Sequence, residues 1–190
     1  MVVVVGSPIL LEESIPPGRR AGGLGVAIAL AASEAGARVE LVGKVRDDVA
    51  GDAIAVELER AGVGHAALLR DPSAATADGS TDRVPLARQD VELALRYLVD
   101  FRVIVAVGPL ADPVSEAIAD AARYSGAHRV VIDGSDRQDD DVTVLRAPPN
   151  GVGAFGAFVG RYAALLDAGH DPRGAFTNAV GDVGWEPARG

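Results

Sequence analysis

The sequence predicts a three-layer α/β/α fold of the Rossmann-like kind with a mainly parallel sheet, and two observations carry this prediction. Ala21–Val63 reads as a helix opened by a glycine pair, a short β-branched strand and a second helix, in immediate succession. A helix, a buried strand and a helix in this order are typical of an α/β layer built on parallel strands. The four consecutive valines Val2–Val5 supply a strand of the kind that is buried on both faces.

Within the first of these stretches, small apolar residues keep the opening helix thin enough to lie against a sheet. Arg38–Val42 reads as the strand that follows, and Gly43–Asp48 reads as a polar turn. The second helix is expected over Val49–Ala61. Asp47 and Asp48 are interpreted as caps of this helix rather than as metal ligands.

The remaining elements follow from apolar runs, caps and glycines. Asp112 is expected to cap the helix that it opens, with Pro113 at the first helical position. Asp71–Arg83 reads as a surface loop and Gln138–Asp141 as an acidic turn. The further strands expected are His65–Leu69, Arg102–Val107, Arg129–Ile132 and Val142–Arg146, and the further helices are Asp90–Leu98, Asp112–Tyr124, Gly153–Ala168 and Asp171–Val180.

Composition limits the partners and the compartment. A chain of 190 residues can bury a substantial core, and no linker divides residues 1–190, so one domain is expected. A formal net charge of −9 argues against nucleic acid or an anionic membrane as a partner, because both require clustered Lys and Arg. The absence of cysteine excludes thiol chemistry and fits a cytoplasmic protein. No apolar run approaches a membrane span, and Met1–Leu11 reads as a strand rather than a signal peptide.

Three glycine-rich stretches resemble motifs of the ribokinase-like (PfkB) carbohydrate kinases. Gly22–Ala27, with the sequence GGLGVA, follows the frame of that family's GGxxxN loop. Gly43–Asp48, together with Gly51, follows its GKVGxD…G motif, and Asn150–Gly160 follows its anion-hole signature DTxGAGDAFxG. The order of the stretches and the type of element at each agree with the family.

The resemblance implies a binding site on the sugar side, an anion-binding turn and the loss of the family's general base. At the sugar side it places Gly22, Gly23, Gly43 and Lys44. In the anion-binding turn it places Asn150, Gly151, Val152, Gly153, Ala154, Phe155 and Gly156. Gly156 stands where the family has the aspartate that serves as general base, so no catalytic residue is identified. Two alternative interpretations remain: Lys44 is a solvated side chain without a ligand, and the glycine-rich turn serves close packing of a helix on the sheet.

Other family positions are also changed. Ile9 and Leu11 stand where the family has an N-x-D pair for the sugar hydroxyls, and Ala27 replaces the asparagine of GGxxxN. Only Ile15–Arg20 separates the first strand region from the glycine pair, and it is interpreted as a loop in place of the family's β-lid. The N-x-x-E magnesium motif and most of the ATP-binding half have no counterpart in the chain.

These features predict a degenerate kinase-like protein, a pseudoenzyme that binds a small polar or phosphorylated ligand without phosphoryl transfer. One alternative is an active sugar or nucleoside kinase that completes its site in an oligomer, and only this alternative implies ATP and magnesium as cofactors. A distant alternative is a dinucleotide-binding oxidoreductase, because Gly151–Gly156 also fits GxGxxG.

No metal site and no nucleic-acid site are expected. The adjacent carboxylates Asp139, Asp140 and Asp141 read as a solvated turn, and the three histidines match no ligand spacing. A homo-oligomer is expected, because a shortened and apolar version of the fold leaves apolar surface uncovered.

Overall fold

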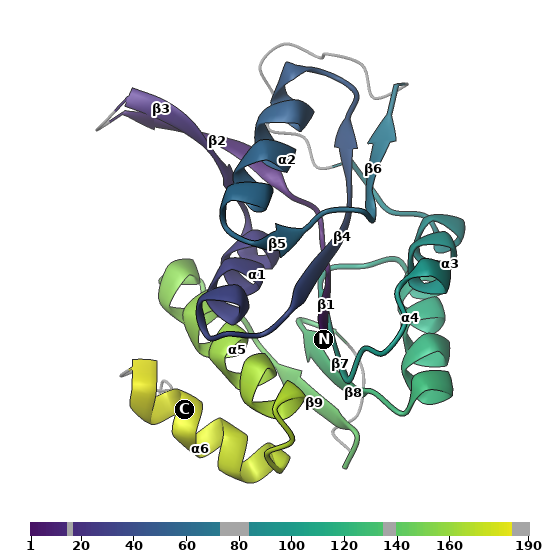
Figure 1. Cartoon of the computed structure of the whole chain (residues 1–190), viewed down its shortest axis with the longest axis vertical. Helices are drawn as coiled ribbons and strands as arrows, with labels where there is room; N and C mark the ends of the chain where they lie inside the picture. The colour runs from purple at the N-terminus through teal and green to yellow at the C-terminus, as the bar shows by residue number, and fades with distance from the viewer. Residues whose placement is uncertain (15–16, 73–83, 135–139, 184–190) are drawn as a thin grey trace.

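The computed structural model describes residues 1–14, 17–72, 84–134 and 140–183. A parallel seven-stranded sheet lies at its centre in the order β5-β4-β1-β7-β8-β9, with β6 also paired to β4 (Figure 1). The strands are β1 (Val2–Val5), β4 (Val39–Arg46), β5 (Val63–Gly64), β6 (Leu68–Asp71), β7 (Val103–Val107), β8 (His128–Ile132) and β9 (Val142–Leu145). A separate antiparallel hairpin comprises β2 (Ile9–Ser14) and β3 (Pro17–Gly22).

Helices cover both faces of the sheet, which confirms the predicted three-layer fold. The helices are α1 (Leu24–Glu34), α2 (Val49–Arg60), α3 (Arg88–Tyr97), α4 (Asp112–Ser125), α5 (Val152–Asp167) and α6 (Pro172–Val183). Alternate valines of β1 enter different cores. Val2 and Val4 pack with α1, α2 and α5, whereas Val3 and Val5 pack with α3 and α4. Each of these four valines is fully buried, as expected of a central parallel strand.

Strand β4 is longer than the sequence predicts. Gly43–Asp48 was expected to form a turn, but Gly43–Arg46 continues the strand. This extension pairs in parallel with β6, so Gly43 lies opposite Leu68 and Arg46 opposite Asp71. A partner strand from a distant part of the chain supplies the hydrogen bonds that local sequence does not reveal.

The loop expected at Ile15–Arg20 is a second correction, because Pro17–Gly22 forms strand β3. It pairs with β2 from Ile9 opposite Gly22 to Ser14 opposite Pro17, and residues 15–16 lie outside the described residues. The backbone N–H of Ala21 donates to the Glu57 carboxylate of α2, which joins the hairpin to the domain. The hairpin is short, and its alternation of apolar and polar residues is weak, so periodicity does not reveal it.

Smaller differences occur elsewhere. Asp112 is the first helical residue of α4 rather than its cap, and Ala111 occupies the cap position. Of the strand expected over His65–Leu69, only Leu68 and Leu69 are in a strand, as the start of β6, because a turn follows the end of β5 at Gly64. Asp71 ends β6 instead of opening a loop. Asp140 and Asp141 form a turn as predicted, whereas residues 73–83, 135–139 and 184–190 of the expected loops and tail lie outside the described part.

Among the described residues, the most extensive contact between two helices joins α1 and α5. A Cβ placed on Gly156 would lie 2.7 Å from the Cβ of Ala27, and one placed on Gly160 would lie 2.6 Å from the Cβ of Ala31. Both contacts have the same offset along the two helices, so the helix axes run in the same direction.

None of the helices described here has the length and apolar character that crossing a membrane requires.

Because α1 and α5 pack so closely, adding one methyl group at Gly160 should destabilise the domain. In Gly160→Ala the new Cβ would also lie 2.6 Å from the carbonyl oxygen of Ile28, and overpacking should lower the free energy of unfolding by about 1–3 kcal/mol. Gly153→Ala, in the same helix, is the matched control, because its Cβ meets nothing within 4 Å and alanine favours the helix. Urea unfolding should show a loss for the first variant only, and equal midpoints would contradict the packing.

Candidate functional site

The carboxyl ends of the parallel strands form the edge at which α/β proteins of this kind bind ligands. Strand β1 lies between β4 and β7, and the chain connects to these neighbours in opposite directions, so the order reverses here. The turn after β1 packs tightly against its surroundings. A Cβ on Gly6 would lie 3.3 Å from the Cβ of Val107 and 3.6 Å from the α-carbon of Gly25. The start of α1 is therefore held at this reversal point.

The first turns of α1 and α5 lie side by side at this edge. The contact of Gly156 with Ala27 lies close to both helix starts, and the two axes run in parallel. Glycine occupies both cap positions, Gly23 for α1 with φ 96° and Gly151 for α5 with φ 83°. Positive φ at both positions is readily adopted only by glycine. We call this arrangement the paired N-termini.

The paired N-termini place the positive ends of two helix dipoles together. Neither helix has a side-chain cap, and neither has an acidic residue in its first turn. Each helix start is equivalent to roughly half a positive charge, from N–H groups that lack acceptors within the helix. The first turn of α5 is exposed, and a Cβ on Gly153 would meet nothing within 4 Å. An anion can therefore approach these N–H groups from solvent.

The structure brings together two predicted groups of residues that are distant in sequence. Gly22 and Gly23, predicted at the sugar side, precede α1. The predicted anion-binding residues Asn150, Gly151, Val152, Gly153 and Ala154 lie, exposed, at the neighbouring start of α5. Their binding roles remain predictions, but their proximity is a fact of the fold.

Phe155 and Gly156 face away from this surface. The Phe155 ring is buried in the core beside Phe158, with ring centroids 6.3 Å apart. The α-carbon of Gly156 faces α1, where a Cβ would contact Ala27. These two residues of the predicted anion turn therefore direct the packing of α5 and offer no side chain to a ligand.

Gly43 supports the turn after β1. A Cβ on Gly43 would lie 2.7 Å from the carbonyl oxygen of Gly6 and 2.8 Å from the Cδ of Pro8, so a larger residue would displace this turn. Its predicted contact with a ligand is untested, but its packing role follows from these distances.

Lys44 lies on the α3 face of the sheet, opposite α1 and α5. Its ammonium group is 2.8 Å from Oδ2 of Asp90 in α3 and 3.7 Å from Oδ2 of Asp71 in β6. The hydrogen bond to Asp90 is the main cause that raises the pKa of Lys44, and burial acts in the opposite direction. Sequence reasoning missed Asp90, because nothing local to Lys44 identifies a partner on a distant helix.

An apolar lip borders the paired N-termini. The Leu11 side chain lies over the α-carbon of Gly22, and Ile9 lies 3.7 Å from the position of a Cβ on Gly23. The resemblance to the kinase family places a polar pair at these two positions, and the hairpin places both residues beside the glycines. Ser7 is a polar group that sequence reasoning missed, and its Oγ donates a 3.4 Å hydrogen bond to the Val84 carbonyl.

A cavity of about 520 Å³ lies beside β8 and α4 on the other face of the sheet. Its polar lining includes Asp112, Ser115, Arg129 and Asp133. Asp133 follows β8 with φ 55°, and its Oδ1 accepts a 3.0 Å hydrogen bond from the N–H of Ala147. The strand end at Asp133 is predictable from sequence, but the cavity is not, because it depends on the position of α4.

Known protein structures share this fold. Ribokinase of Arabidopsis thaliana, determined with ribose and ATP, is 14% identical over 96% of this chain and 90% of that chain, with a TM-score of 0.67. A sugar kinase of Pyrococcus horikoshii is 14% identical over 72% of this chain and 56% of that chain, with a TM-score of 0.51. The 2-dehydro-3-deoxygluconokinase of Thermotoga maritima is 19% identical over 69% of this chain and 50% of that chain, with a TM-score of 0.52.

The chain therefore has the fold of the ribokinase-like sugar kinases, as the glycine motifs predict. It spans about half the length of the Pyrococcus and Thermotoga kinases. No protein-family profile and no curated protein sequence matches it. At these identities the similarity establishes the fold, and activity requires a separate argument.

Asp48 has the predicted role of a cap. Its Oδ1 accepts 3.0 Å hydrogen bonds from the N–H groups of Ala50 and Gly51, and its Oδ2 lies 2.8 Å from Nε of Arg46. The bond from Gly51 is the main cause that lowers the pKa of Asp48 below its ordinary value of 3.8. Asp47 makes no such bond among the described contacts.

This difference predicts unequal effects of two neighbouring substitutions. Asp48→Ala should lower the free energy of unfolding by about 0.5–2 kcal/mol at neutral pH, and Asp47→Ala should have little effect. Because the pKa of Asp48 is lowered on folding, its stabilisation is present above the unfolded-state pKa and is lost as the pH falls through the folded-state value. Urea unfolding from neutral pH to about pH 3 should show the Asp48→Ala deficit shrinking in acid. A deficit that is independent of pH would contradict the charged cap.

Proposed function

We propose that this chain is a kinase-fold protein that binds a small phosphorylated ligand at the paired N-termini and does not transfer phosphate. The observation that carries the proposal is the parallel start of α1 and α5 at the carboxyl edge of the sheet, with a glycine at each cap position and no acidic residue in the first turn of either helix. Two positive helix ends placed together favour an anion more than one end does.

The chemical class of the ligand follows from its surroundings. Glycines at the two cap positions allow a phosphate to approach the backbone N–H groups, which are the donors that helix starts offer to anions. The apolar lip of Ile9 and Leu11 lies beside the same glycines and suits a carbon skeleton attached to the phosphate. The ribose and ATP bound to the Arabidopsis ribokinase belong to the same broad class of phosphorylated and hydroxylated ligands.

The proposed lack of phosphoryl transfer depends on Gly156. Transfer to a hydroxyl requires a group that orients the nucleophile and accepts its proton. A side chain at this position would begin 2.7 Å from the Cβ of Ala27, so α1 excludes a carboxylate here without movement of a helix. The dinucleotide alternative is weaker, because its acidic residue would follow a strand after α5, whereas α5 is followed by α6. The cytoplasmic location remains an expectation from the sequence.

Inorganic phosphate is the first probe of this site. Isothermal titration should detect phosphate binding to the wild type. Gly153→Asp should weaken it by about tenfold or more, because a carboxylate in the first turn of α5 compensates the same N–H groups. The variant should also unfold at a higher temperature without phosphate, by the equivalent of about 0.3–1 kcal/mol.

Gly153→Asn is the matched control, because it has a similar shape without the charge, and its phosphate affinity should stay close to that of the wild type. Equal affinities in the Asp and Asn variants would place any bound phosphate elsewhere. No binding of phosphate or of a phosphorylated sugar by the wild type would reject the site.

The proposal also predicts the absence of sugar-kinase turnover. A coupled ADP-release assay with ATP, magnesium and a panel of sugars and nucleosides should give no sugar-dependent rate, because loss of a general base alone typically costs about 10²–10⁴-fold. Gly156→Asp should not restore activity, and it should lower the melting temperature because its Cβ overlaps α1. Sugar-dependent turnover that copurifies with the wild-type chain, and not with Gly153→Asp, would instead support an active kinase that completes its site in an oligomer.

A further inference from the structure

Helices α3 and α4 lie on the face of the sheet opposite α1 and α5 (Figure 1), and an apolar groove runs along them. The groove has a volume of about 680 Å³. Leu95, Leu98, Phe101, Ala117 and Ala121 are among the residues that line it. Two tyrosines on these helices lie in solvent, with Tyr97 76% and Tyr124 96% exposed. Exposed aromatic side chains beside an apolar groove are typical of an interaction surface.

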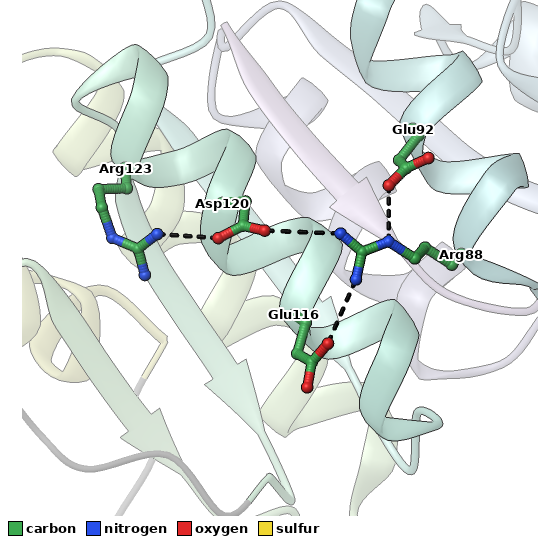
Figure 2. Close-up of polar contacts among 5 residues, drawn as sticks. All are labelled: Arg88, Glu92, Glu116, Asp120 and Arg123. Carbon is green, nitrogen blue, oxygen red and sulfur yellow. Dashed lines mark hydrogen bonds and ion pairs between the residues drawn. The ribbon is translucent and has the colours of Figure 1, made fainter.

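An ion-pair network joins the two helices beside the groove. Figure 2 shows Arg88 of α3 pointing toward α4, with its Nη1 3.2 Å from Glu116 Oε2 and its Nη2 3.6 Å from Asp120 Oδ2. Nε of the same guanidinium lies 2.6 Å from Glu92, and Arg123 holds Asp120 from the other side at 2.8 Å. These contacts join α3 to α4 along the edge of the groove.

Two charged residues of the groove remain available to a partner. Arg96 and Asp100 both line it, and no ion pair of either residue is recorded within the described part of the chain. They have opposite signs and lie four residues apart on one segment. Around a two-fold axis, such a pair is self-complementary, because Arg96 of each copy can face Asp100 of the other.

The charge balance of this face also favours a second copy. The whole chain has a formal net charge of −9, so most surfaces of two copies repel each other. The groove and its network contain nearly balanced charges, namely Arg88, Arg96 and Arg123 against Glu92, Asp100, Glu116 and Asp120. Association through this face therefore brings little net charge together.

We infer that the α3–α4 groove is the interface of a two-fold symmetric homodimer. Tyr124 of each copy inserts into the groove of the other, and Arg96 of each copy pairs with Asp100 of the other. The homo-oligomer expected from the sequence is thereby assigned to the α3–α4 groove. The paired N-termini lie across the sheet from this interface, so each copy keeps its own complete ligand site.

Oligomeric state tests this inference independently of ligand binding. Analytical ultracentrifugation of the wild-type chain across the micromolar range should show a dimer. Tyr124→Asp and Arg96→Glu should each raise the dimer dissociation constant by at least about 30-fold, the loss typical of a central interface residue. Val49→Asp is the matched control: Val49 is 79% exposed on α2, outside the groove, and its replacement should leave the dimer unchanged.

A charge swap distinguishes this pairing from general damage to the surface. Arg96→Glu combined with Asp100→Arg should restore the dimer that Arg96→Glu disrupts, with circular dichroism confirming a native fold for each variant. A wild-type monomer throughout the concentration range would overturn the inference. A dimer that tolerates both Tyr124→Asp and Arg96→Glu would also overturn it, because another face would then be responsible. Failure of the folded double variant to restore the dimer would reject the Arg96–Asp100 pair.

Discussion

The close contact of α1 with α5 is the constraint on which the rest of this structure depends. Gly156 and Gly160 remove two side chains from α5, and α1 fills the space with Ala27 and Ala31. Parallel helices at this separation place their N-termini at one level and at one edge of the sheet. The same contact creates the paired N-termini and excludes a side chain at Gly156. The proposed anion site and the proposed lack of phosphoryl transfer therefore depend on the same helix contact.

The glycine motifs serve packing as well as any ligand. Gly43 accommodates the turn after β1, and Gly22 accommodates Leu11 of the hairpin. Glycines at these positions are required by the packing of the backbone, whether or not they also contact a ligand. A glycine match to a kinase motif is therefore strong support for a fold and weak support for an activity.

Charged side chains in this protein mainly join elements of the fold. Lys44 connects β4 to α3 through Asp90, and Arg88 connects α3 to α4 through Glu116 and Asp120. Sequence reasoning considered Lys44 for a ligand because of its motif, yet its ammonium group is directed to the opposite face of the sheet. The acidic surplus of the chain leaves basic side chains many potential partners, and only the folded arrangement decides among them.

The sequence by itself determined the layered parallel fold, the central position of Val2–Val5, the cap at Asp48 and the two glycine-rich helix starts. These features are local, because periodicity, β-branching and capping act within one or two turns of chain. The tertiary structure alone decided the extension of β4 along β6, the β2–β3 hairpin, the partner of Lys44 and the side-by-side packing of α1 and α5. Each of these depends on contacts between segments that are distant in sequence, and such contacts are set by packing of the whole domain rather than by local preference.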